Sequence, residues 1–201
     1  MSLQKPSRFP LTYALITVNL AVYTYTSLVG RNFIVTDDYV LAFYGQFNWL
    51  VWKGWYWQLF TAMFVHATIF HLLGNMFFLL IFGLRAEELF TKLEYLATYL
   101  SSGLAGNLLT LLLGPYTVST GASGAIFGLL GVCTVYLRRS VGQSVVTALL
   151  YSFFLLIMFS ISPNVNFLAH FGGLVVGLLA GYVVAVRRSF KMRYEYVVSY
   201  E

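Results

Sequence analysis

Long runs of apolar residues, separated by short polar connections, dominate this chain of 201 residues. Each run is long enough, or nearly long enough, to cross the roughly 30 Å of hydrocarbon in a bilayer as a helix. The pattern therefore predicts an all-α, polytopic membrane protein with six spans, approximately at residues 11–29, 68–85, 93–113, 123–137, 145–161 and 166–186.

The fourth apolar run, residues 123–137, is short for a full crossing. A helix of this length is expected to begin below the membrane surface, inside a cavity formed by its neighbours. Ser123 lies at that expected start.

Composition supports the membrane assignment. The chain is 59% hydrophobic and only 9% charged, with a mean hydropathy of +0.77, which excludes an ordinary soluble domain. Its single cysteine, Cys133, excludes an internal disulfide and is expected to be a small buried filler. Residues 1–10 are expected to precede a retained span rather than to begin a signal peptide.

The connection between the first two runs, residues 31–67, is long and rich in aromatic residues, and it carries all four tryptophans. Tryptophan favours the membrane interface, where its ring is apolar and its N–H is hydrated. We expect this loop to lie at the outer interface as short amphipathic pieces.

Basic residues set the expected orientation. With the N-terminus inside, ten of the twelve lysines and arginines fall on the cytoplasmic side, and only Arg31 and Lys53 fall outside. Residues 187–201 are then expected to form a solvated, basic cytoplasmic tail. The net charge of +5 is explained by this asymmetry and by anionic headgroups, so nucleic-acid binding is not predicted.

In this topology the second, fourth and sixth runs all begin on the outer side. His71 and Asn75 lie near the start of the second, Ser123 at the start of the fourth and His170 near the start of the sixth. Four polar residues are therefore expected at one depth. Because polar groups inside a bilayer are costly, the default reading of such a cluster is functional.

Each of these residue types suits one role in nucleophilic catalysis. Ser123 is the candidate nucleophile, with free backbone N–H groups at its helix start, and His170 is the candidate general base. His71 and Asn75 are four residues apart and share a helical face, so their donors can point together at an oxyanion.

Glycines explain how the base reaches the nucleophile. Small residues recur at fourfold spacing on the sixth run and on the fourth, which predicts close packing of these two helices. The glycines expected to serve this structural role are Gly121, Gly124, Gly128, Gly173 and Gly177.

Simpler readings exist for every part of this cluster. The fourth run can be only a packing seam whose serine bonds to its own backbone, and it is not a nucleophile elbow, because Ala125 replaces the final glycine of G-x-S-x-G. His170 can be a structural histidine, and His71 with Asn75 can simply bridge helices. For His66, off that face and near the interface, a structural hydrogen bond to the long loop is favoured.

Other intramembrane chemistries are disfavoured by the residue inventory. There is no H-E-x-x-H motif for a zinc protease, the only aspartates are adjacent, and no lysine lies in the middle of a run. The remaining acids fall on the cytoplasmic side. We therefore expect a serine–histidine dyad without a carboxylate.

Three segments resemble the signatures of the rhomboid family of intramembrane serine proteases. They are His71-Leu-Leu-Gly-Asn75, Gly121-Ala-Ser123-Gly124-Ala-Ile-Phe-Gly128 and Ala169-His170-Phe-Gly-Gly173-Leu-Val-Val-Gly177. The resemblance covers residues 11–186 and implies a minimal, prokaryotic-type six-span catalytic domain in the cell membrane. It implies a Ser123–His170 dyad, with oxyanion donors from His71, Asn75 and the backbone at Ser123. It further implies cleavage of single-pass membrane proteins near the outer ends of their spans, with no metal or cofactor. Glu87 resembles the family's acid at the cytoplasmic end.

Two positions depart from the family pattern. Gln58 follows Trp57 where the family often has arginine, and Phe127 stands where tyrosine is frequent. Phe127 can still stack on His170. Phe153 and Phe154, bulky residues of the fifth run, are expected to form a movable lateral gate for substrate. Phe127 is expected to join them in substrate binding and gating.

Two rivals belong to other classes. A catalytically inactive relative that binds transmembrane helices as a chaperone or trafficking factor is expected to lack the serine or the histidine, and this chain has both. A transporter is a weaker alternative, because the runs lack intramembrane carboxylates and broken repeats.

Overall fold

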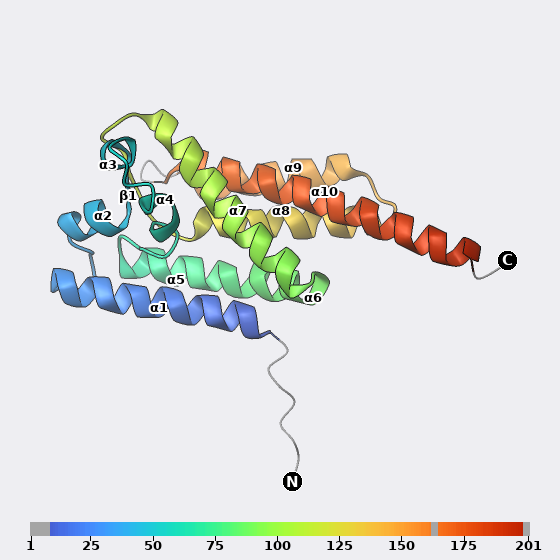
Figure 1. The fold of residues 1–201 in the computed structure, drawn as a ribbon, viewed down its shortest axis with the longest axis horizontal. Coiled ribbons are helices and arrows are strands. Elements are labelled where there is room, and N and C mark those ends of the chain that lie inside the picture. Colours follow the sequence, from blue (N-terminus) through green and yellow to red (C-terminus); the bar gives the residue numbers. More distant parts are fainter. Residues whose placement is uncertain (1–8, 162–164, 199–201) are drawn as a thin grey trace, which may run out of the picture.

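The computed structural model describes residues 9–161 and 165–198, with backbone alone for residues 190–198. Most of its long helices run along one direction, α7 crosses them obliquely, and α10 extends beyond the others at one end (Figure 1). The helices are α1 (Pro10–Gly30), α2 (Asp38–Tyr44), α3 (Asn48–Trp52), α4 (Gln58–Thr61), α5 (Ile69–Phe78), the π-helix η1 (Leu79–Gly83), α6 (Leu84–Leu89), α7 (Lys92–Thr110), the 3₁₀-helix η2 (Leu111–Leu113), α8 (Ser123–Ser140), α9 (Val145–Ser160) and α10 (Phe167–Val198).

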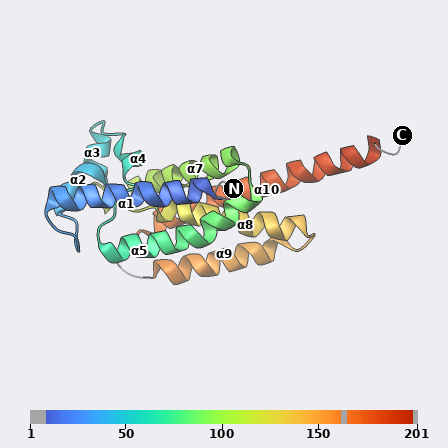
Figure 2. The ribbon, with the colours of Figure 1, turned by 90° about the horizontal axis from the view of Figure 1, so that it is seen from below.

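Helix α8 lies at the centre of the bundle, in contact with α5, α7, α9 and α10 (Figures 1 and 2). Every residue from 124 to 133 is buried. The predicted start of the fourth apolar run is also the first residue of this helix, Ser123. The nucleophile candidate therefore lies at the end of the most enclosed helix.

Glycines bring α8 and α10 into backbone contact. A Cβ atom added at Gly173 would overlap the carbonyl oxygen of Gly124, and one at Gly177 would overlap that of Gly128. Such close approach replaces bulky side chains with direct backbone packing, which is how membrane helices with small residues associate. The sequence predicted these two glycine faces to meet, and this contact fixes the spacing between the two helices that carry Ser123 and His170.

Two charged side chains, Glu87 and Arg188, join neighbouring helices at the end of the bundle opposite the candidate site. The carboxylate of Glu87 accepts hydrogen bonds from the backbone N–H groups of Leu11 and Thr12, both at 2.8 Å, and so caps α1. Arg188 of α10 donates to the Tyr136 hydroxyl at 2.9 Å and pairs with Glu94 of α7 at 2.7 Å. The prediction of a solvated tail from residue 187 onward is therefore wrong for Arg188, which joins three helices.

Residues 31–67 form the three short helices α2, α3 and α4 and a short strand, β1 (Gln46–Phe47). This strand pairs antiparallel with β2 (Val118–Ser119), a contact that the all-α prediction missed because two-residue strands leave no alternation to detect. Gln58 holds the loop together. Its amide donates to the carbonyls of Ala42 and Phe43 at 2.8 and 3.0 Å and accepts from the Phe47 N–H at 3.0 Å.

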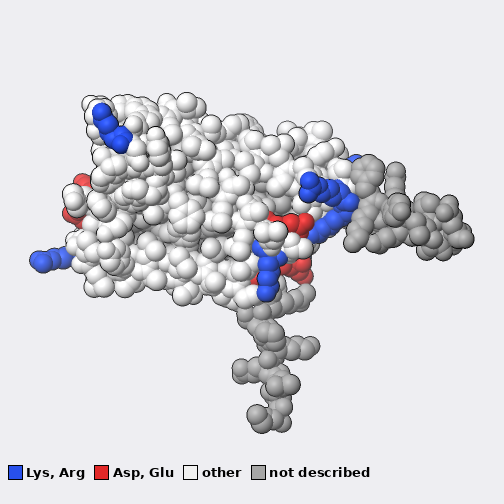
Figure 3. Space-filling model, in the orientation of Figure 1, with Lys and Arg blue, Asp and Glu red and all other residues white. Residues whose placement is uncertain are grey.

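Three helical segments of the described chain are long and apolar enough to cross a membrane: Ile69–Leu89, Lys92–Leu113 and Phe167–Ser189. α9 is apolar but shorter. Six crossings therefore remain a prediction. In the face that Figure 3 shows, charged side chains lie toward the two ends of the molecule and a broad uncharged surface lies between them, as a bilayer requires.

Candidate active site

A tight turn at Gly121 precedes Ser123, the first residue of α8. Gly121 has a φ of +116°, a backbone conformation that residues with a side chain rarely adopt. A Cβ atom at this position would also lie 2.7 Å from the His71 ring. Its N–H donates to the Ala62 carbonyl at 2.9 Å, so the turn is tied to the long loop. The first N–H groups of a helix lack partners within it, and here they lie next to the serine hydroxyl.

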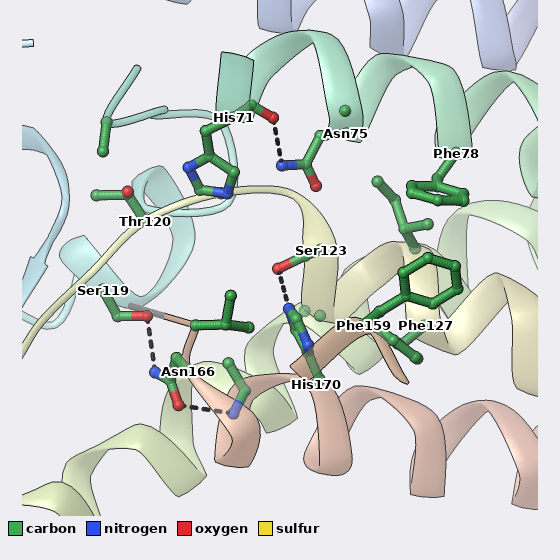
Figure 4. A pocket seen from close by; sticks show the side chains of 18 of the residues that line it. His71, Asn75, Phe78, Ser119, Thr120, Ser123, Phe127, Phe159, Asn166 and His170 are labelled. Carbon is green, nitrogen blue, oxygen red and sulfur yellow. Dashed lines mark hydrogen bonds between the residues drawn. The ribbon is translucent and has the colours of Figure 1, made fainter. Parts of the chain in front are cut away.

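Ser123 and His170 are hydrogen-bonded across the interface of α8 and α10. The distance between Ser123 Oγ and His170 Nε2 is 2.8 Å (Figure 4). The histidine is buried, with 6% of its surface exposed, while the serine is partly accessible. A serine hydroxyl that faces an imidazole nitrogen at this distance is in the geometry of a nucleophile with its general base.

Two further contacts hold the His170 ring. The Phe127 ring stacks on it, with centroids 4.6 Å apart and planes inclined at 29°. The other ring nitrogen, Nδ1, lies 2.7 Å from the hydroxyl of Ser160, the last residue of α9. Both ring nitrogens of His170 therefore have hydrogen-bond partners, and Phe127 covers one face of the ring.

Asn166 holds the start of α10 in place. Its carbonyl oxygen accepts from the Ala169 N–H at 3.0 Å, and its amide donates to Thr110 and to Ser119 at 2.7 and 2.9 Å. The residue caps the helix and links it to α7 and β2. The backbone position of His170 is set by these contacts.

His71 and Asn75 face Ser123 from α5, across the opening seen in Figure 4. The Asn75 amide donates one hydrogen to the His71 carbonyl at 2.9 Å. An amide nitrogen carries two hydrogens, so the second can serve another acceptor. Thus all four polar residues expected from the sequence line one cavity.

The cavity measures about 670 Å³ and lies between α5, α8 and α10, with the end of α9 closing one side. Its apolar lining includes five phenylalanines: Phe70, Phe78, Phe82, Phe127 and Phe159. A largely apolar pocket with a few convergent polar groups is the usual form of a ligand site.

The structure separates the two residues of the fifth run that were expected to form a gate from the cavity. Phe153 and Phe154 are 53% and 59% exposed on the outer surface of α9, and neither lines the cavity. Phe159 does, and its ring contacts that of Phe78 on α5 at a centroid distance of 4.8 Å. This pair bridges the α5–α9 opening, the side of the cavity that lies between these two helices.

His66 is fully buried against His71, with ring centroids 5.2 Å apart. Its Nδ1 lies 3.2 Å from the Phe64 carbonyl, the expected bond to the loop, and its own carbonyl accepts from Thr36 at 2.8 Å. Burial, with a smaller contribution from His71, lowers the pKa of His66 to about 3. His66 is thus neutral at physiological pH, and its ring packs against that of His71.

Sequence reasoning missed Ser160, Asn166, Phe78 and Phe159. Asn166 did carry a signal, because asparagine before an apolar run is a common helix cap. In the described part of the chain, no group of three metal-binding side chains comes together. The absence of a metal or cofactor stays a prediction.

Comparison with known proteins identifies the class to which this fold and site belong. The family model described as "Rhomboid domain" matches residues 53–187. The chain belongs to the rhomboid family.

Individual relatives support this membership. The chain is similar to "Putative rhomboid protease YdcA" of Bacillus subtilis (strain 168), with 30% identity over 90% of this chain and 91% of that protein. It is also similar to two Arabidopsis thaliana proteins, "RHOMBOID-like protein 1" and "RHOMBOID-like protein 6, mitochondrial". The identities are 34% over 67% of this chain and 33% over 82% of it. The chain spans only 36% and 56% of the lengths of these plant relatives.

Proposed function

We propose that this protein is an intramembrane serine endopeptidase that uses a Ser123–His170 dyad. The observation that carries the proposal is the 2.8 Å hydrogen bond between Ser123 Oγ and His170 Nε2 at the wall of a cavity in an apolar bundle. Membership in a family that includes named proteases supports the same reaction class.

The reaction follows from the positions of the groups. Ser123 Oγ attacks the carbonyl carbon of a peptide bond while His170 Nε2 takes the hydroxyl proton. The tetrahedral oxyanion accepts hydrogen bonds from Asn75, His71 and the backbone at the start of α8. Collapse breaks the C–N bond, and the departing amine takes the proton from His170. Water then attacks the acyl carbonyl carbon while His170 takes its proton. Collapse breaks the bond to Ser123 Oγ, which takes the proton back from His170, and releases the new carboxyl terminus.

Substrates are single-pass membrane proteins that enter sideways from the lipid. The cavity is bounded by the Phe78–Phe159 pair, which lies between two helices that face the hydrocarbon. α9 is the natural moving part, because only Ala148, Ser152 and Leu156 along its length are buried. A small outward movement of this helix opens the cavity to a transmembrane segment.

The proposed orientation has both termini in the cytoplasm and the cavity toward the outer side. It places Arg31 and Lys53 outside and the other ten basic residues inside. Cysteine accessibility tests this directly: in a Cys133→Ala background, a cysteine introduced at Lys53 should react with an impermeant maleimide on intact cells, and one at Arg139 should not.

The alternative is an inactive relative that binds transmembrane helices. An inactive relative requires neither an activated serine nor a partner for it, whereas here both residues are present and hydrogen-bonded. This contact favours the enzyme.

Covalent labelling separates the two functions. The purified protein in detergent is treated with a fluorophosphonate probe, and wild type is compared with Ser123→Ala and His170→Ala by intact mass. Labelling of wild type alone is expected. Equal absence of label in all three, together with no cleavage of a transmembrane reporter in proteoliposomes, would leave helix binding as the function.

A further inference from the structure

Ser160 is the last residue of α9, and its side chain contacts the candidate base, His170. Its hydroxyl is 2.7 Å from Nδ1 of His170, and this nitrogen is the one that does not face Ser123. A neutral imidazole carries a single N–H, so the partner of one nitrogen decides the role of the other.

We propose that Ser160 is a positioning residue for the dyad, holding His170 with its proton on Nδ1 so that Nε2 is free to accept the Ser123 proton. The proposal rests on the proposed protease function. The tautomer with its proton on Nε2 cannot act as a base toward Ser123, and an acceptor at Nδ1 disfavours it. Ser160 thus takes the place that a carboxylate occupies in a triad, with a neutral oxygen in place of a charge.

The same contact connects the base to the position of α9. The buried residues of this helix recur every fourth position at Ala148, Ser152 and Leu156, and Ser160 is the next in that series. They form one narrow stripe facing α8 and α10, while residues on the other faces, such as Phe153, are exposed. A helix packed through one stripe can move outward as a unit, and such a movement withdraws Ser160 from His170.

Two neighbours reinforce this coupling. Leu156, one turn before Ser160, belongs to the same buried cluster as Phe127, which stacks on His170. Phe159, next to Ser160, closes the cavity against Phe78. Closure of the α5–α9 opening and alignment of the base therefore depend on one end of one helix. When α9 moves outward, a substrate enters while the dyad is misaligned. When α9 returns, the alignment of Ser123 and His170 is restored.

The test compares Ser160→Ala with Ser160→Thr, which retains the hydroxyl, and with Ser152→Ala. Ser152 is a matched control, because it is a buried serine on the same stripe for which no hydrogen-bond partner is present among the described residues. Cleavage of a transmembrane reporter in proteoliposomes gives kcat and KM. We expect Ser160→Ala to lower kcat about tenfold with little change in KM, since the lost bond stabilises the imidazolium more than the ground state. Ser160→Thr should restore most of kcat, and Ser152→Ala should resemble wild type.

A spectroscopic measurement separates positioning from a loss of packing. The chain has three histidines, so selective ¹⁵N-histidine labelling gives three pairs of ring signals, assigned with His66→Gln and His71→Gln. Wild type should show His170 with its proton on Nδ1. In Ser160→Ala, its two nitrogen shifts should move toward each other as the tautomers mix. Unchanged His170 shifts in Ser160→Ala, or a kcat equal to that of wild type, would overturn the proposal.

This failure is distinguishable from failure of the proposed function. If wild type cleaves the reporter and Ser123→Ala does not, the protease assignment stands whatever Ser160→Ala does. If wild type neither cleaves the reporter nor reacts with the fluorophosphonate, the protease assignment itself fails, and the role of Ser160 falls with it.

Discussion

The Phe127 ring lies flat against the imidazole of His170, 4.6 Å from it between centroids, in the position expected from the sequence. Phe127 is on α8, one turn after Ser123, so the helix that carries the nucleophile also covers the base. The 29° inclination leaves the edge of the imidazole, with both nitrogens, free for Ser123 and Ser160.

Replacing Phe127 with leucine should lower kcat while leaving KM nearly unchanged. A ring stacking contact is worth about 0.5–1.5 kcal/mol, which corresponds to a loss of roughly threefold to tenfold in rate. The measurement is reporter cleavage in proteoliposomes. Phe127→Tyr is the control that keeps the ring, and its rate should stay close to that of wild type. A leucine variant as active as the tyrosine variant would contradict the stacking role.

Asn75→Ala should reduce kcat about a hundredfold, because it removes one donor from the oxyanion site. The rate of fluorophosphonate labelling should fall in parallel, since the phosphonyl oxygen occupies the same position. Asn19 is a matched control. It makes the same amide-to-carbonyl contact within its helix, to Leu15 at 2.8 Å, but lies on α1 away from the cavity. Equal rates for Asn75→Ala and Asn19→Ala would exclude Asn75 from catalysis.

The sequence predicted well what topology alone decides. Ser123, His170, His71 and Asn75 lie at the starts of apolar runs that enter from one side, so hydropathy and lysine and arginine counts were enough to bring them together. The glycine repeat added the helix pair that joins serine and histidine. Hydropathy, charge counts and glycine spacing can all be obtained from the sequence without knowing how the helices pack.

The sequence did not predict which side of an apolar helix faces the protein. α9 is apolar on all sides, so periodicity does not tell which residues face the protein and which face lipid. Phe153 and Phe154 were chosen for their bulk and lie outside, whereas Phe159 lies at the cavity. Ser160 was missed for the same reason. Gln58 was noted only as a departure from the arginine frequent in the family, yet its amide satisfies three backbone groups of the loop.

Gly177→Ala should destabilise the fold by about 1–3 kcal/mol, because the new methyl group overlaps the Gly128 carbonyl across the α8–α10 contact. Thermal or denaturant unfolding in detergent measures this change. Gly74→Ala is the control for stability alone, since nothing lies within 4 Å of a Cβ atom there and alanine favours the helix. Equal stability of the two variants would mean that α8 and α10 are not held by this close contact.

Phe159→Ala should raise turnover severalfold by removing the ring that meets Phe78 across the α5–α9 opening. If entry of the substrate limits the rate, a smaller side chain lowers that barrier while Ser160 still reaches His170. Phe153→Ala and Phe154→Ala are matched in volume on the same helix but face outward, so their rates should equal that of wild type. Cleavage of a transmembrane reporter compares the three directly, and a soluble unfolded substrate, which need not pass between the helices, should be cleaved equally by all of them. Faster cleavage in the two outward variants and not in Phe159→Ala would return the gate to the lipid-facing side of α9.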